Sequence, residues 1–154
     1  MVLFVFGIAA LPGIWIIGLL VDRWLRWSVL GSLLLFGLVG AALGLAAASP
    51  LVLLTAVALW GLSFGGAATL LQTASADAAG ANVDVAQAMV TTVWNLAIAG
   101  GGLVGGLLLG SAGPAVFPWV LLGLLTAGWL VAWSASGHGF RPGRRTGAAP
   151  ASNL

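Results

Sequence analysis

Long apolar runs, separated by a few short polar stretches, make up most of the chain. Five of these runs are about 20 residues or longer, which is the length a helix needs to cross roughly 30 Å of hydrocarbon. They cover residues 2–21, 28–48, 51–74, 86–110 and 115–136. The pattern predicts an all-α membrane protein whose transmembrane domain, residues 1–137, contains five helices.

The connections between these runs are short and differ in kind. The first is the one stretch between two apolar runs that carries both signs of charge, so we expect a polar turn at a membrane surface. The third is the longest loop, and the other two are tight, uncharged turns. The connections are, in chain order, residues 22–27, Ser49-Pro50, residues 75–85 and Gly113-Pro114. After the last run, the Gly-, Ala- and Pro-rich residues 138–154 are predicted to form a disordered cytoplasmic tail.

Arginine residues predict the orientation in the membrane. Basic residues close to the ends of spans stay on the cytoplasmic side. Arg23 and Arg26 place the first turn inside, and the four spans that follow return the tail to the same side. The tail carries the other three arginines, Arg141, Arg144 and Arg145. We therefore expect a multi-pass protein of the plasma (inner) membrane, with its N-terminus outside and its C-terminus in the cytoplasm.

Composition supports the bilayer as solvent. The 154 residues are 61% hydrophobic and only 5% charged, with a mean hydropathy of +1.16, so a soluble domain would lack the polar surface it needs. The 24 glycines favour closely packed helices over a barrel with a polar lumen. The chain has no cysteine, which excludes disulfides and thiolate metal sites. Three of the five basic residues share the tail, so we expect no nucleic-acid partner.

Two motifs of soluble enzymes occur inside predicted spans, where their chemistry lacks its partners. Residues 61–65 fit G-x-S-x-G, but that motif requires a strand-to-helix elbow and a histidine, and the single histidine, His138, lies in the tail. Residues 100–105 fit G-x-G-x-x-G, but no acidic residue follows Asp84 to bind a ribose. We expect neither an enzyme nor a cofactor. We interpret the small residues at 61, 63, 65 and 67 as a surface for helix packing.

Glycine spacing in the fourth span predicts another packing face. Gly101 and Gly105, and likewise Gly102 and Gly106, form overlapping GxxxG pairs. A helix face without side chains allows a neighbouring helix to approach closely, and in a transporter the same face can also serve rocking of one helix bundle on another.

Polar side chains within spans are candidates for a small-molecule path, because each must be satisfied internally or face water. These residues are Thr69, Gln72, Gln87, Thr91, Thr92 and Asn95. Hydrogen bonding to neighbouring helices is the alternative for each of them. Deep tryptophans such as Trp60 and Trp94 suit apolar or cationic ligands, or simply pack. Tryptophans near span ends, Trp24, Trp27, Trp119 and Trp133, are interpreted as interfacial anchors.

The first turn resembles a loop motif of the major facilitator superfamily. Gly18-x-Leu20-x-Asp22-Arg23-x-x-Arg26 is similar to G-x-L-a-D-r-x-G-r-k, which occurs between spans two and three and, more loosely, between spans eight and nine. Leu25 and Trp27 stand where the motif has glycine and a basic residue, which suits the looser copy. Residues 59–77 and 94–102 look like helices ten and eleven of the drug and sugar efflux branch of this superfamily.

The resemblance implies that the five spans correspond to helices eight to twelve of a twelve-helix efflux permease. Its partners would be a drug-like or sugar-like substrate, the bilayer and a missing N-terminal half, without which the chain is not transport-competent. A chain that enters an apolar run directly after Met1 agrees with this expectation. All three aspartates lie in loops, so a proton-coupling residue would come from the missing half. The alternative is a stand-alone five-span structural or interaction protein.

The resemblance also implies roles for individual residues. The turn residues Gly18, Asp22, Arg23 and Arg26 would form a gating element, with Asp22 accepting hydrogen bonds from a helix start or pairing with an arginine. Alternatively, these charges only set topology. Trp60, Phe64, Thr69 and Gln72 would face the central substrate cavity, flanked by Trp94 and Asn95.

The predicted orientation is tested with topology reporters. A reporter fused after Ser49 is expected outside the cell and one fused after Asn82 inside, because an odd number of crossings separates the two sites. Alkaline phosphatase and green fluorescent protein fusions measure the two locations. The reverse pattern would contradict the span assignment.

Overall fold

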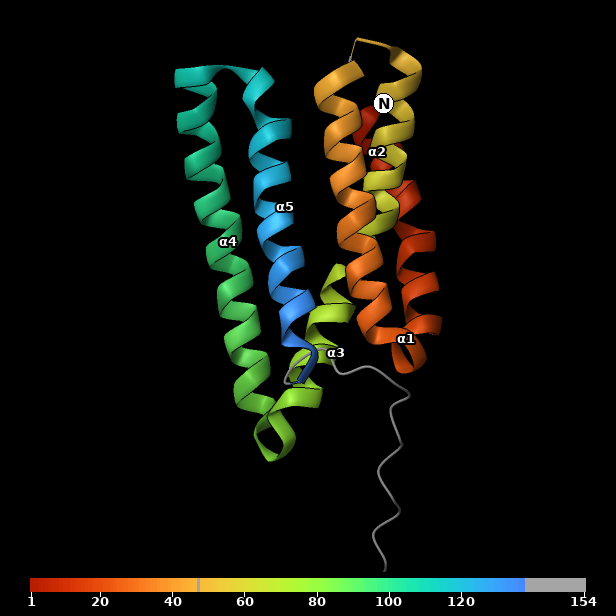
Figure 1. Cartoon of the computed structure of the whole chain (residues 1–154), viewed down its shortest axis with the longest axis vertical. Helices are drawn as coiled ribbons and strands as arrows, with labels where there is room; N and C mark the ends of the chain where they lie inside the picture. The colour runs from red at the N-terminus through yellow and green to blue at the C-terminus, as the bar shows by residue number, and fades with distance from the viewer. Residues whose placement is uncertain (47, 138–154) are drawn as a thin grey trace, which may run out of the picture.

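The computed structural model describes residues 1–46 and 48–137, and this part of the chain is almost entirely helical, without a strand (Figure 1). Three continuous helical segments are long and apolar enough to cross a bilayer, which makes the chain a helical membrane protein. These segments are Val2–Ala46, Pro50–Ala112 and Pro114–Gly137. The described chain thus has three long helical segments rather than the five separate spans expected. The predicted tail, 138–154, lies outside the described residues.

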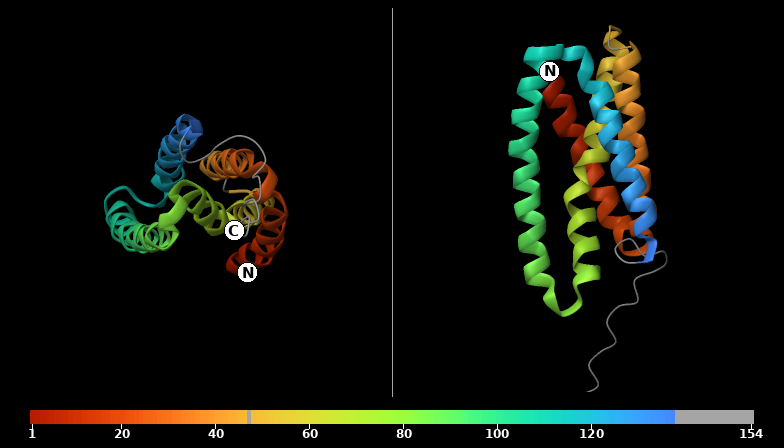
Figure 2. Two further views of the ribbon diagram at one scale, coloured as in Figure 1. Left: turned by 90° about the horizontal axis from the view of Figure 1, so that it is seen from below. Right: turned by 60° about the vertical axis from the view of Figure 1, so that its left-hand side comes forward.

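The first segment, α1 (Val2–Ala46), consists of two helical arms joined by a bend at Trp24, whose backbone is not helical (φ −134°, ψ 30°). Phe6 in the first arm (2–23) and Phe36 in the second arm (25–46) both contact the ring of Trp60, at centroid distances of 5.2 and 5.7 Å. In a straight helix these two residues would lie about 45 Å apart. The chain therefore doubles back at the bend, where the two arms converge (Figure 2). The polar turn expected over 22–27 is confined to a single non-helical residue.

The second segment reverses once. It comprises α2 (Pro50–Gly65), α3 (Ala67–Ala79), the short turn η1 (Gly80–Asn82) and α4 (Val83–Ala112). Pro50 opens α2, where its missing N–H costs nothing. Gly80 has φ 54°, a conformation that favours glycine, and the chain turns there.

The loop predicted over 75–85 was too long. Only Gly80–Asn82 leaves the α-helical path, because the alanines that precede it are strong helix formers. The hydroxyl of Ser75 also donates to the carbonyl of Gln72 (2.9 Å), which satisfies this polar side chain within the helix.

The third segment contains η2 (Pro114–Val116), α5 (Phe117–Ser134) and η3 (Ala135–Gly137). Gly113, with φ 75°, permits the turn from α4. Helix α5 packs along the second arm of α1, close to Gly40 and Gly44. Helix α4 packs mainly against α3, and none of its residues is buried. Viewed along the long axis, α4 stands at the edge of the bundle (Figure 2).

A cluster of buried side chains lies around the bend of α1. Five α1 side chains from both sides of Trp24 meet two from α3 and one from α5. They are Ile17, Val21, Leu25, Val29, Leu30, Leu70, Ala74 and Ala132. The bend is therefore the point at which three separate parts of the chain share one apolar core.

Glycines make the closest backbone contacts between the first arm of α1 and α2. A Cβ added to Gly61 would meet the carbonyl of Phe6, and one added to Gly65 would meet the carbonyl of Ala10. Ser63, between them, is buried and donates to the carbonyl of Trp60 (3.0 Å). Of the packing surface expected at 61, 63, 65 and 67, the first three positions are thus in contact or buried, and Ala67 is half-buried. Ser63 lies within a helix rather than on a nucleophile elbow.

The glycine face predicted on the fourth span is open. A Cβ added to Gly101, Gly102 or Gly106 would have nothing within 4 Å, and one added to Gly105 would meet only Phe117 Cε1, at 3.7 Å. No helix of the described chain covers this face. Close packing there stays a prediction.

A methyl group should therefore have opposite effects at two glycines. Gly61→Ala is expected to lower the free energy of unfolding by about 1–3 kcal/mol through overpacking against Phe6. The control Gly101→Ala should be neutral or stabilising by up to about 1 kcal/mol, because alanine favours the helix. Unfolding in mixed detergent micelles, followed by circular dichroism, measures both. Equal destabilisation by the two changes would contradict this difference in packing.

Candidate functional site

Five aromatic rings form a continuous chain across three parts of the structure, here called the aromatic cluster. Both α1 arms contribute a phenylalanine, α2 contributes Trp60 and Phe64, and α4 contributes Trp94. Phe64 lies 6.2 Å from Phe6, 6.4 Å from Phe36 and 6.1 Å from Trp94, centroid to centroid. These distances fall within the range of favourable aromatic pairs. The structure thus brings together the three aromatic residues singled out in the sequence.

The aromatic cluster is not sealed. Trp60 is 37% exposed and Phe64 42% exposed, so ring surface remains accessible beside the ring contacts. In lipid, such surface can pack against acyl chains or against an apolar or cationic solute.

Two cavities flank Trp94 between α3 and α4. The larger, of about 600 Å³, is lined almost entirely by apolar side chains, among them Leu71, Met89 and Val93. The smaller, of about 140 Å³, is lined by Gln72, Thr91 and Asn95 together with apolar neighbours. Gln72, Trp94 and Asn95 are therefore brought together as the sequence suggested. Thr69 is half-buried on α3 and lines neither cavity.

A ladder of polar side chains runs beside the smaller cavity. Gln87 Nε2 on α4 donates to the Gln72 carbonyl (2.9 Å) and to Ser75 Oγ (3.2 Å), both on α3. On α4 itself, the Thr91 hydroxyl donates to the Gln87 carbonyl and the Asn95 amide to the Thr91 carbonyl. Gln87 thus forms hydrogen bonds to a neighbouring helix, which was the alternative to a role in a small-molecule path. Thr91 and Asn95 instead donate within α4, and their side chains line the smaller cavity, where their other hydrogen-bonding groups can meet a ligand.

At the bend of α1, Arg26 contacts the end of α5. Its two terminal nitrogens donate to the carbonyls of Ala132 (Nη1, 3.3 Å) and Trp133 (Nη2, 2.8 Å), and its Cζ lies 5.6 Å from the Trp133 ring centroid. The last carbonyls of a helix have no partner within the helix and carry partial negative charge. Arg26 therefore caps α5 with its charge, its donors and a cation–π contact.

The other motif residues have different surroundings. Asp22 and Arg23 are exposed at the bend. Gly18 is exposed, and nothing lies within 4 Å of a Cβ at that position. Arg26 thus joins two helices.

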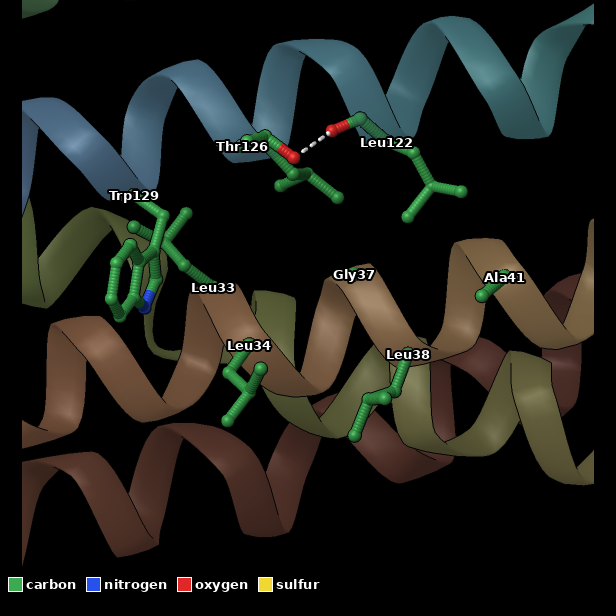
Figure 3. Close-up of a pocket in the computed structure, with 9 residues that line it drawn as sticks. Leu33, Leu34, Gly37, Leu38, Ala41, Leu122, Thr126 and Trp129 are labelled. Atoms are coloured by element: carbon green, nitrogen blue, oxygen red, sulfur yellow. Dashed lines mark hydrogen bonds between the residues drawn. The ribbon is translucent and has the colours of Figure 1, made fainter.

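An apolar groove, here called the α1–α5 groove, separates the second arm of α1 from α5 (Figure 3). It has a volume of about 390 Å³ and nine lining residues. These are Leu33, Leu34, Gly37, Leu38, Ala41, Leu122, Leu125, Thr126 and Trp129. The Thr126 hydroxyl donates to the carbonyl of Leu122 (2.7 Å), so the hydroxyl in the groove is satisfied within α5.

Sequence reasoning missed Phe6 and Phe36 as members of the aromatic cluster. Phe36 and Trp60 lie at comparable depths on either side of the Ser49-Pro50 turn, and this antiparallel register was the available signal for their contact. The Arg26 cap had no such signal, because Arg26 and Trp133 are separated by most of the chain.

Comparisons with protein-family models, with curated proteins and with solved structures give no match for this chain.

The Arg26 cap predicts a loss of stability that the neighbouring arginine does not share. Arg26→Gln is expected to lower the free energy of unfolding by about 1–2 kcal/mol, since two charged hydrogen bonds to α5 are lost. Hydrogen exchange should accelerate in the last turn of α5. Arg23→Gln, at an exposed position on the same bend, is the control and should leave that exchange unchanged. Equal effects of the two substitutions would contradict the cap.

Proposed function

We propose that this chain is the C-terminal part of a small-molecule efflux permease of the major facilitator type, and that the region around Trp94 contacts the substrate. The aromatic cluster carries the proposal. It gathers Trp60, Phe64 and Trp94 from two helices of the chain and joins them to both arms of α1. Such a wall suits flat apolar or cationic solutes.

The adjoining cavities support the same assignment. A volume of about 600 Å³ lies within the range that drug-sized ligands occupy. The smaller cavity adds Gln72 and Asn95, amides that can orient a polar group of the ligand. A mostly apolar site with a few polar groups is typical of small-molecule binding.

The reversals of the chain support five crossings. Each arm of α1 contains enough apolar residues to span the hydrocarbon core, and Pro50–Ala112 turns back at Gly80–Asn82. With Arg23 and Arg26 at the cytoplasmic surface, the proposed orientation has the N-terminus outside and the C-terminus inside.

Alternating access by this type of transporter requires two halves that rock about a shared site. The proposed partner is accordingly an N-terminal half, and the 154-residue chain alone is proposed to bind substrate without pumping it. The Arg26 contact between the α1 bend and α5 would act at the cytoplasmic mouth, where a change in helix tilt could break or restore it.

A second candidate, a stand-alone structural or interaction protein, is favoured by one observation. The glycine face of α4, with Gly101, Gly102 and Gly106, is open within the described chain. A face of this kind can receive a helix of another molecule. This function requires association through α4 and no affinity of the aromatic cluster for solutes.

Binding of the lipophilic cation tetraphenylphosphonium distinguishes the two functions. The purified chain in detergent is expected to bind it, and Trp60→Ala should weaken binding about tenfold, the scale of a desolvated cation–π contact. Trp15→Ala, at a tryptophan that is 68% exposed and outside the aromatic cluster, is the control. Equilibrium dialysis measures the affinities. Absence of binding, or equal losses in the two variants, would contradict the transporter proposal.

A further inference from the structure

We infer that the α1–α5 groove binds one acyl chain of an anionic phospholipid whose phosphate lies at the arginines of the α1 bend. This inference does not depend on the proposed transport function.

The packing of the two helices builds the groove. Near the far end of the second arm, Gly40 lies against Leu121 and Leu122, and Gly44 against Pro118 and Trp119. At the other end, Arg26 fastens the bend to the last turn of α5. Between these contacts the helices separate, and nothing lies within 4 Å of a Cβ added to Gly37. The groove is therefore open along its middle and held at both ends.

The lining selects hydrocarbon. Seven of the nine lining residues have no polar side-chain group. The other two are Trp129, which has an indole N–H, and Thr126, whose hydroxyl donates within α5. A polar solute would find no hydrogen-bonding partner on most of this wall, whereas an acyl chain needs none. Figure 3 places Trp129 beside Leu33, at the end of the groove closer to the bend.

Aromatic contacts connect that end of the groove to positive charge. Trp129 stacks on Trp133 at a centroid distance of 5.1 Å, and Arg26 lies over Trp133. Arg23 is exposed on the same bend, and with Asp22 the three charges of the bend sum to +1. Tryptophan prefers the membrane interface, and arginine binds phosphate oxygens. Because Arg26 already caps α5, we assign the main phosphate contact to Arg23.

The dimensions match a lipid in one leaflet. From Arg26 to Ala41, the helix rises about 22 Å. Half of a bilayer, including its headgroup region, is also about 20–22 Å thick. A phospholipid with its phosphate at the bend would therefore place its acyl chain along the groove, parallel to both helices.

Lipid binding to the purified chain tests this inference. Dioleoyl phosphatidylglycerol and dioleoyl phosphatidylcholine are titrated separately in detergent, with native mass spectrometry as the readout. The anionic lipid is expected to bind about fivefold more tightly, the contribution of one basic residue near phosphate. Arg23→Gln should remove this preference, mainly by weakening the binding of phosphatidylglycerol.

A bulky residue in the groove provides the second arm of the experiment. Gly37→Phe should lower the affinity for phosphatidylglycerol about tenfold, because a ring displaces two or more buried methylenes of the acyl chain. Gly31→Phe is the matched control, since Gly31 lies on the same arm, likewise has nothing within 4 Å of an added Cβ, and does not line the groove. Equal affinities for the two lipids would overturn the inference. So would equal effects of the two phenylalanine substitutions.

Discussion

The bend of α1 at Trp24 is the constraint on which the rest of the described structure depends. In hydrocarbon every backbone N–H and C=O must be satisfied within the protein, so a reversal of the chain belongs at a membrane surface. Trp24 is the non-helical residue inside α1, and three charged residues surround it. Around it lies the buried apolar cluster, which includes Leu70 of α3 and Ala132 of α5. The position of the bend thus determines both the depth of the two arms and the side on which other helices pack.

Two arginines of the bend have different surroundings, although they are only three residues apart. Arg26 holds the end of α5 through two carbonyls and Trp133, a contact that needs a long planar cation with several donors. Arg23 is exposed. The positive-inside bias requires only that Arg23 and Arg26 remain on the same side of the membrane. The contact with α5 adds a structural requirement at Arg26 alone.

The sequence was sufficient for the all-α class and for most helix ends, because apolar run length and turn residues such as Pro50 and Gly113 act locally. It was insufficient wherever the outcome depends on which helix lies opposite. Gly61 and Gly65 have the same spacing as Gly101 and Gly105, yet only the first pair meets a neighbouring backbone.

The same limit applies to the aromatic cluster. Trp60 and Trp94 could be singled out as deep aromatics and Phe64 through the family resemblance, whereas Phe36 joins them only through the register of two antiparallel helices. Most of the predicted loop at 75–85 is helical. The prediction gave more weight to its polar residues than to the helix propensity of its alanines.

Packing density differs sharply across the candidate site. On one side, the first arm of α1 meets α2 through backbone contacts at Gly61 and Gly65, where even a methyl group would not fit. On the other side, α4 has no buried residue, and two cavities lie between it and α3. Regions with few buried contacts require the least free energy to move. Trp94 lies on this loosely held helix and contacts Phe64 on the tightly held α2, at a centroid distance of 6.1 Å. Movement of α4 would therefore change the aromatic cluster and both cavities together, while the contact between α1 and α2 stays as it is.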